Sequence, residues 1–449
     1  MKWYILALIV LAAPTIAAWL RTNPKNAPFV WGLLGFLPFV LGPWHLIIAP
    51  YATPMWSGYV KGWEVSALDS VALGIIFGTR GRWGPLTLVL PFLAYIFAVI
   101  VAVPQARFGH LALSYPFQLT RALFVFLAVS RVVVSERGER AVLTGLIAGL
   151  ALQAGYAIFD HAGGAIQSGG SLGHQNLLGF LSHMVLMPAF AMLVAGRWKW
   201  EALVGVLAGV TVVILTASRA TIAFGTVGLA LTLLFSITVG FTARKAMIAV
   251  LGVLLLAASY PLAQAALAHR FENQTTKMFA EDKEREAFER AAYAMLTAKP
   301  LGVGPNHYVF IANTEGYSER AGVAWRTQSR STNVHNSYLL VAAETGYLGL
   351  ITMLSLLGSA IGYAFWTAIR FRRQPGAEVL IGVGCGITAI CLHGLYEWMF
   401  VVYPTQYVFA VSLGIISGLR NRFLQRVAES SRAKRSERKI QRQTLMSTT

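Results

Sequence analysis

The sequence predicts an all-α integral membrane protein, and two observations carry this prediction. The chain of 449 residues is 56% hydrophobic and only 12% charged, whereas soluble domains carry about 25% charged residues. The apolar residues also gather in windows of about 20, each long enough to cross a bilayer as a helix. We therefore expect about 12 transmembrane helices and one polar, helical lobe on the extracytoplasmic side.

Apolar segments recur along most of the chain. Segment 64–78 is short and contains Asp69, which favours a partial or interfacial helix and leaves about 12 spans. Segment 3–20 has the length of a signal peptide, but Lys2 is the only charge before it, so we expect a retained helix. The candidate spans are 3–20, 29–50, 64–78, 84–104, 116–134, 140–160, 176–195, 200–217, 220–241, 246–268, 347–369, 378–395 and 400–418.

Basic residues recur in the short loops on one side of this arrangement, and we expect that side to be cytoplasmic. The loop residues are Arg80, Arg82, Arg137, Arg140, Arg197, Lys199, Arg244, Lys245, Arg370, Arg372 and Arg373. The tail from Arg420 to Arg442, with nine Lys/Arg and two Glu, belongs on the same side. A solvated or lipid-touching tail explains it without a specific function, so the net charge of +18 does not require nucleic acid.

The sequence leaves open which side of the membrane the N-terminus faces. Arg21 and Lys25 favour a cytoplasmic loop 21–28. Twelve spans with the N-terminus inside would place that loop on the other side. The charges and the span count therefore disagree.

One long polar insertion interrupts the apolar segments. Residues 269–335 hold eight of the chain's 19 Asp/Glu, and we expect them to form the extracytoplasmic lobe. A helix in this lobe ends at Pro300, and Leu301–Asn306 is typical of a turn. The remaining domains are N-terminal transmembrane helices in 1–268, C-terminal transmembrane helices in 336–418 and a basic cytoplasmic tail in 419–449.

Two pairs on the predicted lobe helix have a favourable i,i+4 orientation, namely Glu281 with Arg285 and Glu286 with Arg290. Elsewhere, Cys385 and Cys391 lie six residues apart in one apolar segment. This spacing puts them on different helix faces, so we expect neither a disulfide nor a metal site. No Cys/His/carboxylate cluster has metal-ligand spacing, and we expect no cofactor.

The passage from the lobe into the next span carries a histidine. Asn336 or Ser337 is suited to cap a helix there, because a short oxygen-bearing side chain accepts an otherwise unpaired backbone N–H. His335 would then stand at a helix start, at the edge of the membrane. Imidazole is the side chain best matched to moving protons near neutral pH. The alternative is a boundary histidine that only hydrogen-bonds the loop.

Further polar groups are expected at membrane depth on the same side. Arg219 occupies a very tight turn between two spans, where a guanidinium is costly unless it is paired or lines a wet cavity; snorkelling is the alternative. His174 and Asn176 open another span, and Arg121 lies a few residues inside its own. Glu397 follows His393 by one helical turn, although aromatic neighbours favour an interfacial belt for His393.

Three of the lobe's arginines are further candidates, namely Arg290, Arg326 and Arg330. A surface salt bridge is the ordinary role of each one alone. Together with Arg219 and His335 they predict a basic, outward-facing pocket. Because arginine forks match phosphate oxygens bidentately, a polyprenyl-linked pyrophosphate sugar would fit such a pocket.

Several motifs in a fixed order resemble the O-antigen ligase family, polytopic inner-membrane proteins that share a signature domain with O-antigen polymerases. The resemblance covers about residues 170–410, and the first 160 residues match only in hydropathy. Ala220, where relatives often have glycine, and Ala294, where a bulkier aromatic is expected, depart from the pattern. The matching motifs are Gly-His-Gln-Asn at 173–176, Thr-Ala-Ser-Arg-Ala at 216–220, Glu-Arg at 289–290, Lys-Pro-Leu-Gly-Val-Gly-Pro-Asn at 299–306 and Val-His-Asn-Ser-Tyr-Leu at 334–339, followed by Glu344, Gly346 and Gly349.

The resemblance implies an O-antigen ligase of the bacterial inner membrane, multi-pass, with its active site on the periplasmic side. Such an enzyme transfers a preassembled glycan from undecaprenyl pyrophosphate to a sugar of the lipid A core, without metal or ATP. Its plan is similar to that of the membrane-embedded glycosyltransferases of GT-C type. By the same resemblance, His335 is the essential loop histidine, and Arg219 and Arg290 are the essential arginines.

We therefore hypothesise an inverting transfer in which His335 is the general base and Arg219 and Arg290 bind the diphosphate. The expected partners are the lipid-linked glycan donor, the lipid A core acceptor and membrane lipids, without nucleic acid. Further substrate-binding candidates are Arg326, Arg330, Arg121, His174, Asn176, Asn336 and Glu397.

Other functions remain open at the level of sequence. An O-antigen polymerase or a protein O-oligosaccharyltransferase would share the chemistry. A lipid-linked oligosaccharide flippase or another transporter would instead show inverted hydropathy repeats, with polar residues spread to the midplane from both sides. The polar groups here concentrate on one side, which favours a transferase.

Overall fold

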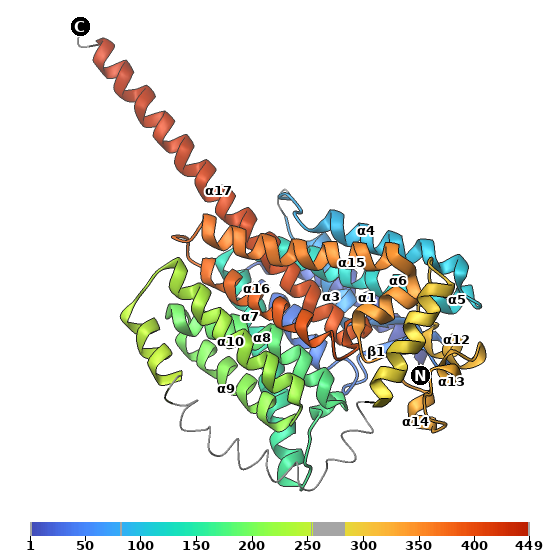
Figure 1. Cartoon of the computed structure of the whole chain (residues 1–449). Coiled ribbons are helices and arrows are strands. Elements are labelled where there is room, and N and C mark those ends of the chain that lie inside the picture. Colours follow the sequence, from blue (N-terminus) through green and yellow to red (C-terminus); the bar gives the residue numbers. More distant parts are fainter. Residues whose placement is uncertain (1, 81–82, 253, 255–282, 448–449) are drawn as a thin grey trace.

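The structure is a computed structural model that describes residues 2–80, 83–252, 254 and 283–447, with side chains to residue 432. Most of the predicted span 246–268 and the start of the predicted lobe, 269–282, lie outside the described residues. The described part is built almost entirely of helices that pack side by side (Figure 1). This confirms the predicted all-α membrane class, to which the structure adds one small hairpin.

The principal helices are α1 (Lys2–Thr22), α2 (Ala27–Phe36), α3 (Ala67–Gly78), α4 (Val89–Ala102), α6 (Ser114–Val132), α7 (Glu136–Ala162), α8 (Gln175–Ala195), α9 (Lys199–Leu215), α10 (Arg219–Val239), α15 (Ser337–Arg370), α16 (Ala377–His393) and α17 (Tyr403–Ser447). Among the described residues, six helices are long and apolar enough to cross a membrane by length and composition. These are Trp3–Thr22, Gly109–Val132, Glu136–Ala162, Gln175–Ala195, Arg219–Val239 and Ser337–Arg370. Shorter apolar helices lie at Ala27–Phe39, Ala67–Gly78, Val89–Gln105 and Ala377–His393. The total of about 12 spans stays a prediction.

The prediction of one continuous span over 29–50 is wrong. Helix α2 passes into a short 3-10 turn, η1 (Leu37–Phe39), and the chain then forms strand β1 (Ile47–Ala52). Pro38 and Pro43 each lack a backbone N–H, which ends a helix that hydropathy alone would continue. Strand β1 pairs antiparallel with β2 (Gly62–Ser66) in a two-stranded sheet.

Segment 64–78 is mostly helix, with the end of strand β2 at its start and α3 over Ala67–Gly78, in line with the expected partial helix. Strand β2 ends at Ser66, which caps α3. The Ser66 hydroxyl and the Asp69 carboxylate each accept a hydrogen bond from the other residue's backbone N–H, which forms a capping box. Asp69 is therefore placed by its own helix start.

Arg121, on α6, lies inside the helix bundle. Its Nε donates to Oδ2 of Asp69 at 2.9 Å, and its Nη1 lies 3.7 Å from Oε2 of Glu64. The Tyr407 hydroxyl on α17 donates to Oδ1 of Asp69 at 2.8 Å. The side chains of Arg121 and Asp69 are only 4% and 7% exposed. Arg121 thus joins α3, α6 and α17 and lines neither of the large polar cavities described below.

Replacement of Arg121 by alanine is expected to destabilise the protein by about 3–5 kcal/mol, because it leaves a buried carboxylate without its cation. The melting temperature in detergent should fall strongly, whereas Arg137→Ala, at an exposed arginine, should change it little. A stable Arg121→Ala protein that has lost activity would instead support the substrate-binding role predicted from the sequence.

The two termini lie at opposite ends of the bundle (Figure 1). Near the N-terminus, the Trp3 ring packs edge-on against Tyr51 of β1, with ring centroids 6.4 Å apart. The hairpin also contacts the lobe, since the Val60 N–H donates to Oδ1 of Asn306 at 2.9 Å. The N-terminus therefore lies at the lobe end, and α1, about 30 Å long, carries Arg21 to the other end.

The described part of the predicted lobe comprises residues 283–335. It contains a helix over 283–298, which ends before Pro300 as predicted, and the short helices α12 (Tyr308–Thr314), α13 (Tyr317–Arg320) and α14 (Thr327–Arg330). The predicted turn Leu301–Asn306 docks on α15. Glu344, which is 1% exposed, accepts hydrogen bonds from the backbone N–H groups of Asn306 and Tyr308, both at 2.8 Å, and from the Tyr59 hydroxyl at 2.6 Å.

Gly346 allows this close docking. Its φ of 67° interrupts α15, and a Cβ there would lie 2.4 Å from the carbonyl oxygen of Pro300. Both facts require glycine, because L-residues with a side chain rarely adopt this conformation. The lobe is therefore fixed to the first turns of α15, beside His335.

Candidate functional site

His335 stands immediately before α15, as the cap prediction requires. Oδ1 of Asn336 accepts hydrogen bonds from the backbone N–H groups of Tyr338 and Leu339, at 3.0 and 3.1 Å. The backbone N–H of Ser337 donates to the Gly394 carbonyl at 2.8 Å. The helix start is thus bound to the segment that follows α16, and this segment carries Glu397.

His335 and Glu397 are in direct contact. Nδ1 of His335 lies 3.3 Å from Oε2 of Glu397. The Glu397 side chain is only 2% exposed, whereas that of His335 is 24% exposed. The carboxylate is therefore enclosed behind an imidazole that reaches solvent.

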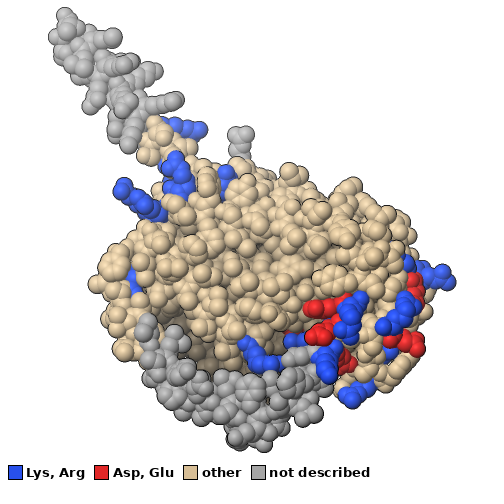
Figure 2. Space-filling model, in the orientation of Figure 1, with Lys and Arg blue, Asp and Glu red and all other residues tan. Residues whose placement is uncertain are grey.

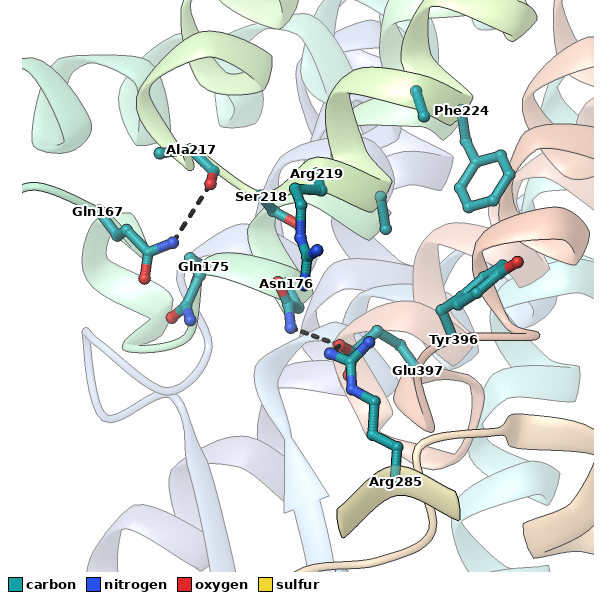
Figure 3. Close-up of a pocket in the computed structure, with 12 residues that line it drawn as sticks. Gln167, Gln175, Asn176, Ala217, Ser218, Arg219, Phe224, Arg285, Tyr396 and Glu397 are labelled. Carbon is teal, nitrogen blue, oxygen red and sulfur yellow. Dashed lines mark hydrogen bonds and ion pairs between the residues drawn. The ribbon is translucent and has the colours of Figure 1, made fainter. Parts of the chain in front are cut away.

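The other oxygen of Glu397 contacts two further elements (Figure 3). Nδ2 of Asn176, in the first turn of α8, donates to Oε1 at 2.5 Å, and Nη2 of Arg285 from the lobe helix lies 3.8 Å from the same atom. Burial alone raises the pKa of Glu397. The hydrogen bond and charge of His335, together with the charges of Arg285 and His393, outweigh burial and hold this pKa below its ordinary value. Glu397 is thus an ionised acceptor.

A cavity of about 660 Å³, here called the arginine cavity, opens beside Glu397. Arg219 reaches it from the tight turn between α9 and α10, where Ala217 has a φ of 47° and Ser218 caps α10. In Figure 3 the side chains of Arg219 and Arg285 both extend toward Asn176 and Glu397. The lining residues are Gln167, Gln175, Asn176, Ala217, Ser218, Arg219, Ala220, Ala223, Phe224, Arg285, Tyr396 and Glu397.

A second cavity of about 870 Å³, here called the lobe cavity, lies on the other side of the pair. Figure 2 shows acidic and basic side chains mixed on the lobe surface. Arg290 is held at this cavity, since its Nη2 donates to the Ala321 carbonyl at 3.0 Å. The lining residues are Lys283, Glu284, Glu286, Phe288, Arg290, Gly322, Ala324, Arg326, Gln328, Ser329, Thr332 and His335.

The two cavities share one boundary. Glu397 lines the arginine cavity, His335 lines the lobe cavity, and the two side chains touch. A molecule in either cavity would therefore lie close to the same imidazole–carboxylate pair.

The structure brings six of the predicted residues together at these cavities: His335, Arg219, Arg290, Arg326, Asn176 and Glu397. Asn336 acts as the helix cap. His174 is the N-cap residue of α8; burial lowers its pKa, partly opposed by the negative charge of Glu397. A catalytic or binding role for each of them remains a prediction.

Two of the predicted site residues, Arg121 and Arg330, make contacts away from the two cavities. Arg121 is enclosed in the bundle, as described above. Arg330 makes contacts within the lobe. Its Nη2 donates to the Val323 carbonyl at 2.9 Å, and its guanidinium lies 4.0 Å from the ring centroid of Trp325. Neither lines the two cavities.

Sequence reasoning missed Arg285 as a site residue. The sequence predicts an i,i+4 pair of Arg285 with Glu281, and Glu281 lies outside the described residues. The second predicted pair, Glu286 with Arg290, is confirmed at 3.7 Å. The reach of Arg285 to Glu397 depends on where the lobe helix sits over the α16–α17 segment, and no local pattern encodes that. Among the described residues, no group of three or more His, Cys, Asp or Glu is placed to hold a metal ion.

Residues 203–354 match the family model described as O-antigen ligase. This match covers about a third of the 449 residues and includes Arg219, Arg285, Arg290 and His335. Asn176 and Glu397 lie outside it. A comparison with curated proteins found no significant match. The family resemblance deduced from the sequence motifs is confirmed by the matched residues.

Proposed function

We propose, from the match of residues 203–354 to the O-antigen ligase family model, that the chain is an O-antigen ligase of the inner membrane. It transfers a preassembled O-antigen glycan from undecaprenyl pyrophosphate to a sugar of the lipid A core on the periplasmic face. The observation that carries this proposal is the meeting of two polar cavities at the contact between His335 and Glu397. A transferase with two large substrates needs such an arrangement.

The arginine cavity suits the lipid-linked donor. Arg219 and Arg285 line it, and guanidinium groups match the oxygens of a diphosphate in charge and in geometry. Its wall on α10 is apolar, with Ala223 and Phe224. Helix α10 also exposes apolar side chains, for example Ile222 at 46%, along which a polyprenyl chain can lie within the bilayer.

The lobe cavity suits the acceptor sugar. Gln328, Ser329 and Thr332 supply amide and hydroxyl groups for sugar hydroxyls. Arg290 and Arg326 add positive charge on the same side. His335 faces this cavity, so an acceptor hydroxyl bound there would lie within reach of the imidazole.

Glu397 determines which nitrogen of His335 is free. An ionised carboxylate only accepts hydrogen bonds, so Nδ1 of His335, at 3.3 Å, carries the proton of the neutral ring. Nε2 then bears the lone pair and can take the proton of the acceptor hydroxyl. Asn176 and Arg285 hold Glu397 in place.

The transfer is a single inverting displacement. The acceptor oxygen gives its proton to Nε2 and forms a bond to the anomeric carbon as the bond from that carbon to the pyrophosphate oxygen breaks. The electron pair of the broken bond remains on undecaprenyl pyrophosphate. Arg219 and Arg285 stabilise this charge directly, which is the effect of a preorganised electrostatic site. Arg290 adds positive charge from the lobe side.

In vitro transfer tests the proposal. Purified protein is mixed with glycan on undecaprenyl pyrophosphate and rough lipopolysaccharide, with EDTA and without nucleotide. We expect a ladder of glycosylated lipid. Longer chains on undecaprenyl pyrophosphate with the acceptor unmodified would instead identify a polymerase, and glycosylated protein would identify a protein-directed ligase. Donor movement across a vesicle membrane without any product would identify a transporter.

A further inference from the structure

A third groove lies at the end of the molecule away from the lobe. It has a volume of about 630 Å³ and lies where α15 ends and α17 leaves the bundle. Figure 2 shows Lys and Arg side chains gathered at this point. The lining residues are Trp366, Arg370, Phe371, Arg372, Arg373, Gln374, Leu424 and Val427.

The three arginines of this groove differ from most of their neighbours at the same end. Arg197 and Arg422 both pair with the buried carboxylate of Glu139, and Arg140 pairs with Glu201. These arginines hold helices together.

Arg370, Arg372 and Arg373, by contrast, are exposed, and no carboxylate among the described residues forms a salt bridge with them. The groove has no acidic lining residue within the described part of the chain. Three guanidinium groups are therefore available to one anion.

The same groove has an apolar wall. Trp366 is 51% exposed and Val427 is 47% exposed. Leu424 of α17 completes the wall. Large apolar side chains with this exposure, close to three arginines that form no salt bridge with a described carboxylate, fit a ligand with an anionic head and a hydrocarbon tail.

We propose that this groove binds an anionic phospholipid. Its phosphate contacts Arg370, Arg372 and Arg373, and one acyl chain lies against Trp366 and Val427. The phosphodiester accepts hydrogen bonds from the guanidinium forks, and the acyl chain covers side chains that water would otherwise contact. The site lies at the opposite end from the arginine cavity, so the proposal does not depend on the proposed transfer reaction.

The test is lipid binding to the full-length protein in neutral detergent, with phosphatidylglycerol and phosphatidylcholine as probes. Native mass spectrometry gives the apparent Kd, and the melting temperature gives an independent readout. We expect preferential binding of phosphatidylglycerol, weakened by salt because the contact is electrostatic. Each arginine near a membrane surface contributes about 1 kcal/mol. Arg372→Gln should therefore weaken binding roughly fivefold, and the triple variant R370Q/R372Q/R373Q on the order of 100-fold.

Arg137→Gln is the matched control, because Arg137 is also exposed and lines a separate groove on α7; its binding of phosphatidylglycerol should remain unchanged. Trp366→Ala should weaken the lipid several-fold without any change in charge. Water-soluble glycerol 1-phosphate should compete poorly. Equal binding of the two lipids, full binding by the triple variant, or competition by glycerol 1-phosphate as strong as by the lipid would overturn the proposal.

Discussion

His335→Ala is expected to lower the rate of glycan transfer by about 10²–10⁴-fold, the usual contribution of a positioned general base. The acceptor hydroxyl would keep its proton at neutral pH and would attack the anomeric carbon only slowly. The fold should persist, because the His335 side chain is 24% exposed and the cap that starts α15 belongs to Asn336. The measurement is the initial rate of lipid glycosylation, alongside the melting temperature.

A second substitution separates proton transfer from positioning. His335→Gln keeps a hydrogen-bond donor that can face Glu397 but has no group that takes up a proton near neutral pH. Its rate should fall as far as that of His335→Ala. The control is His110→Ala, since His110 is exposed and lines neither cavity. Normal transfer by His335→Ala would remove His335 from the reaction, and near-normal transfer by His335→Gln would make it a positioning residue.

Local signals in the sequence predicted the local parts of this site. The cap at Asn336, the tight turn before Arg219 and the helix end at Pro300 each follow from a few neighbouring residues, and the structure confirms all three. Backbone N–H groups at a helix start need nearby acceptors, and proline excludes a helical hydrogen bond. These constraints act within one or two turns, so they can be recognised without the fold.

The polar network around His335 could not be predicted in the same way. Glu397 is 62 residues from His335 and 221 residues from Asn176. Their contact requires α8 to pack against α16, and small residues allow this: a Cβ on Gly382 of α16 would lie 2.6 Å from the Met187 carbonyl oxygen of α8. A single sequence does not reveal which helix faces meet.

Arg121 illustrates the opposite case, a predicted site residue that lies in a buried ion pair and lines neither cavity. An arginine near a membrane surface is a functional candidate by default, and the sequence alone placed Arg121 with the other site residues. Its partner Asp69 lies in segment 64–78, which the sequence predicts as a partial or interfacial helix. No local pattern in the sequence pairs Asp69 with Arg121, so their ion pair is not predicted. The prediction of a continuous span over 29–50 is wrong for a related reason. A hydropathy average over this window does not register the individual prolines that end α2.

The second large effect on catalysis is expected at Arg219. Arg219→Ala is expected to reduce kcat by about 10²–10³-fold, as the loss of one preorganised group does in a site where charge grows in the transition state. The charge of the leaving diphosphate increases as its bond to the sugar breaks, so the guanidinium stabilises the transition state more than the bound donor. Kinetics with varied donor concentration separate this kcat effect from a change in donor KM.

Arg219→Lys should recover part of the rate, because it restores the charge but not the two parallel hydrogen bonds of the fork. Arg320→Ala is the control, since Arg320 stacks on Tyr317 with 4.8 Å to the ring centroid and lines neither cavity. If Arg219→Ala changed only the KM for rough lipopolysaccharide, the arginine cavity would hold the acceptor, and the donor would belong in the lobe cavity. A loss confined to kcat and donor KM places the pyrophosphate beside Arg219 and the attacking hydroxyl on the His335 side.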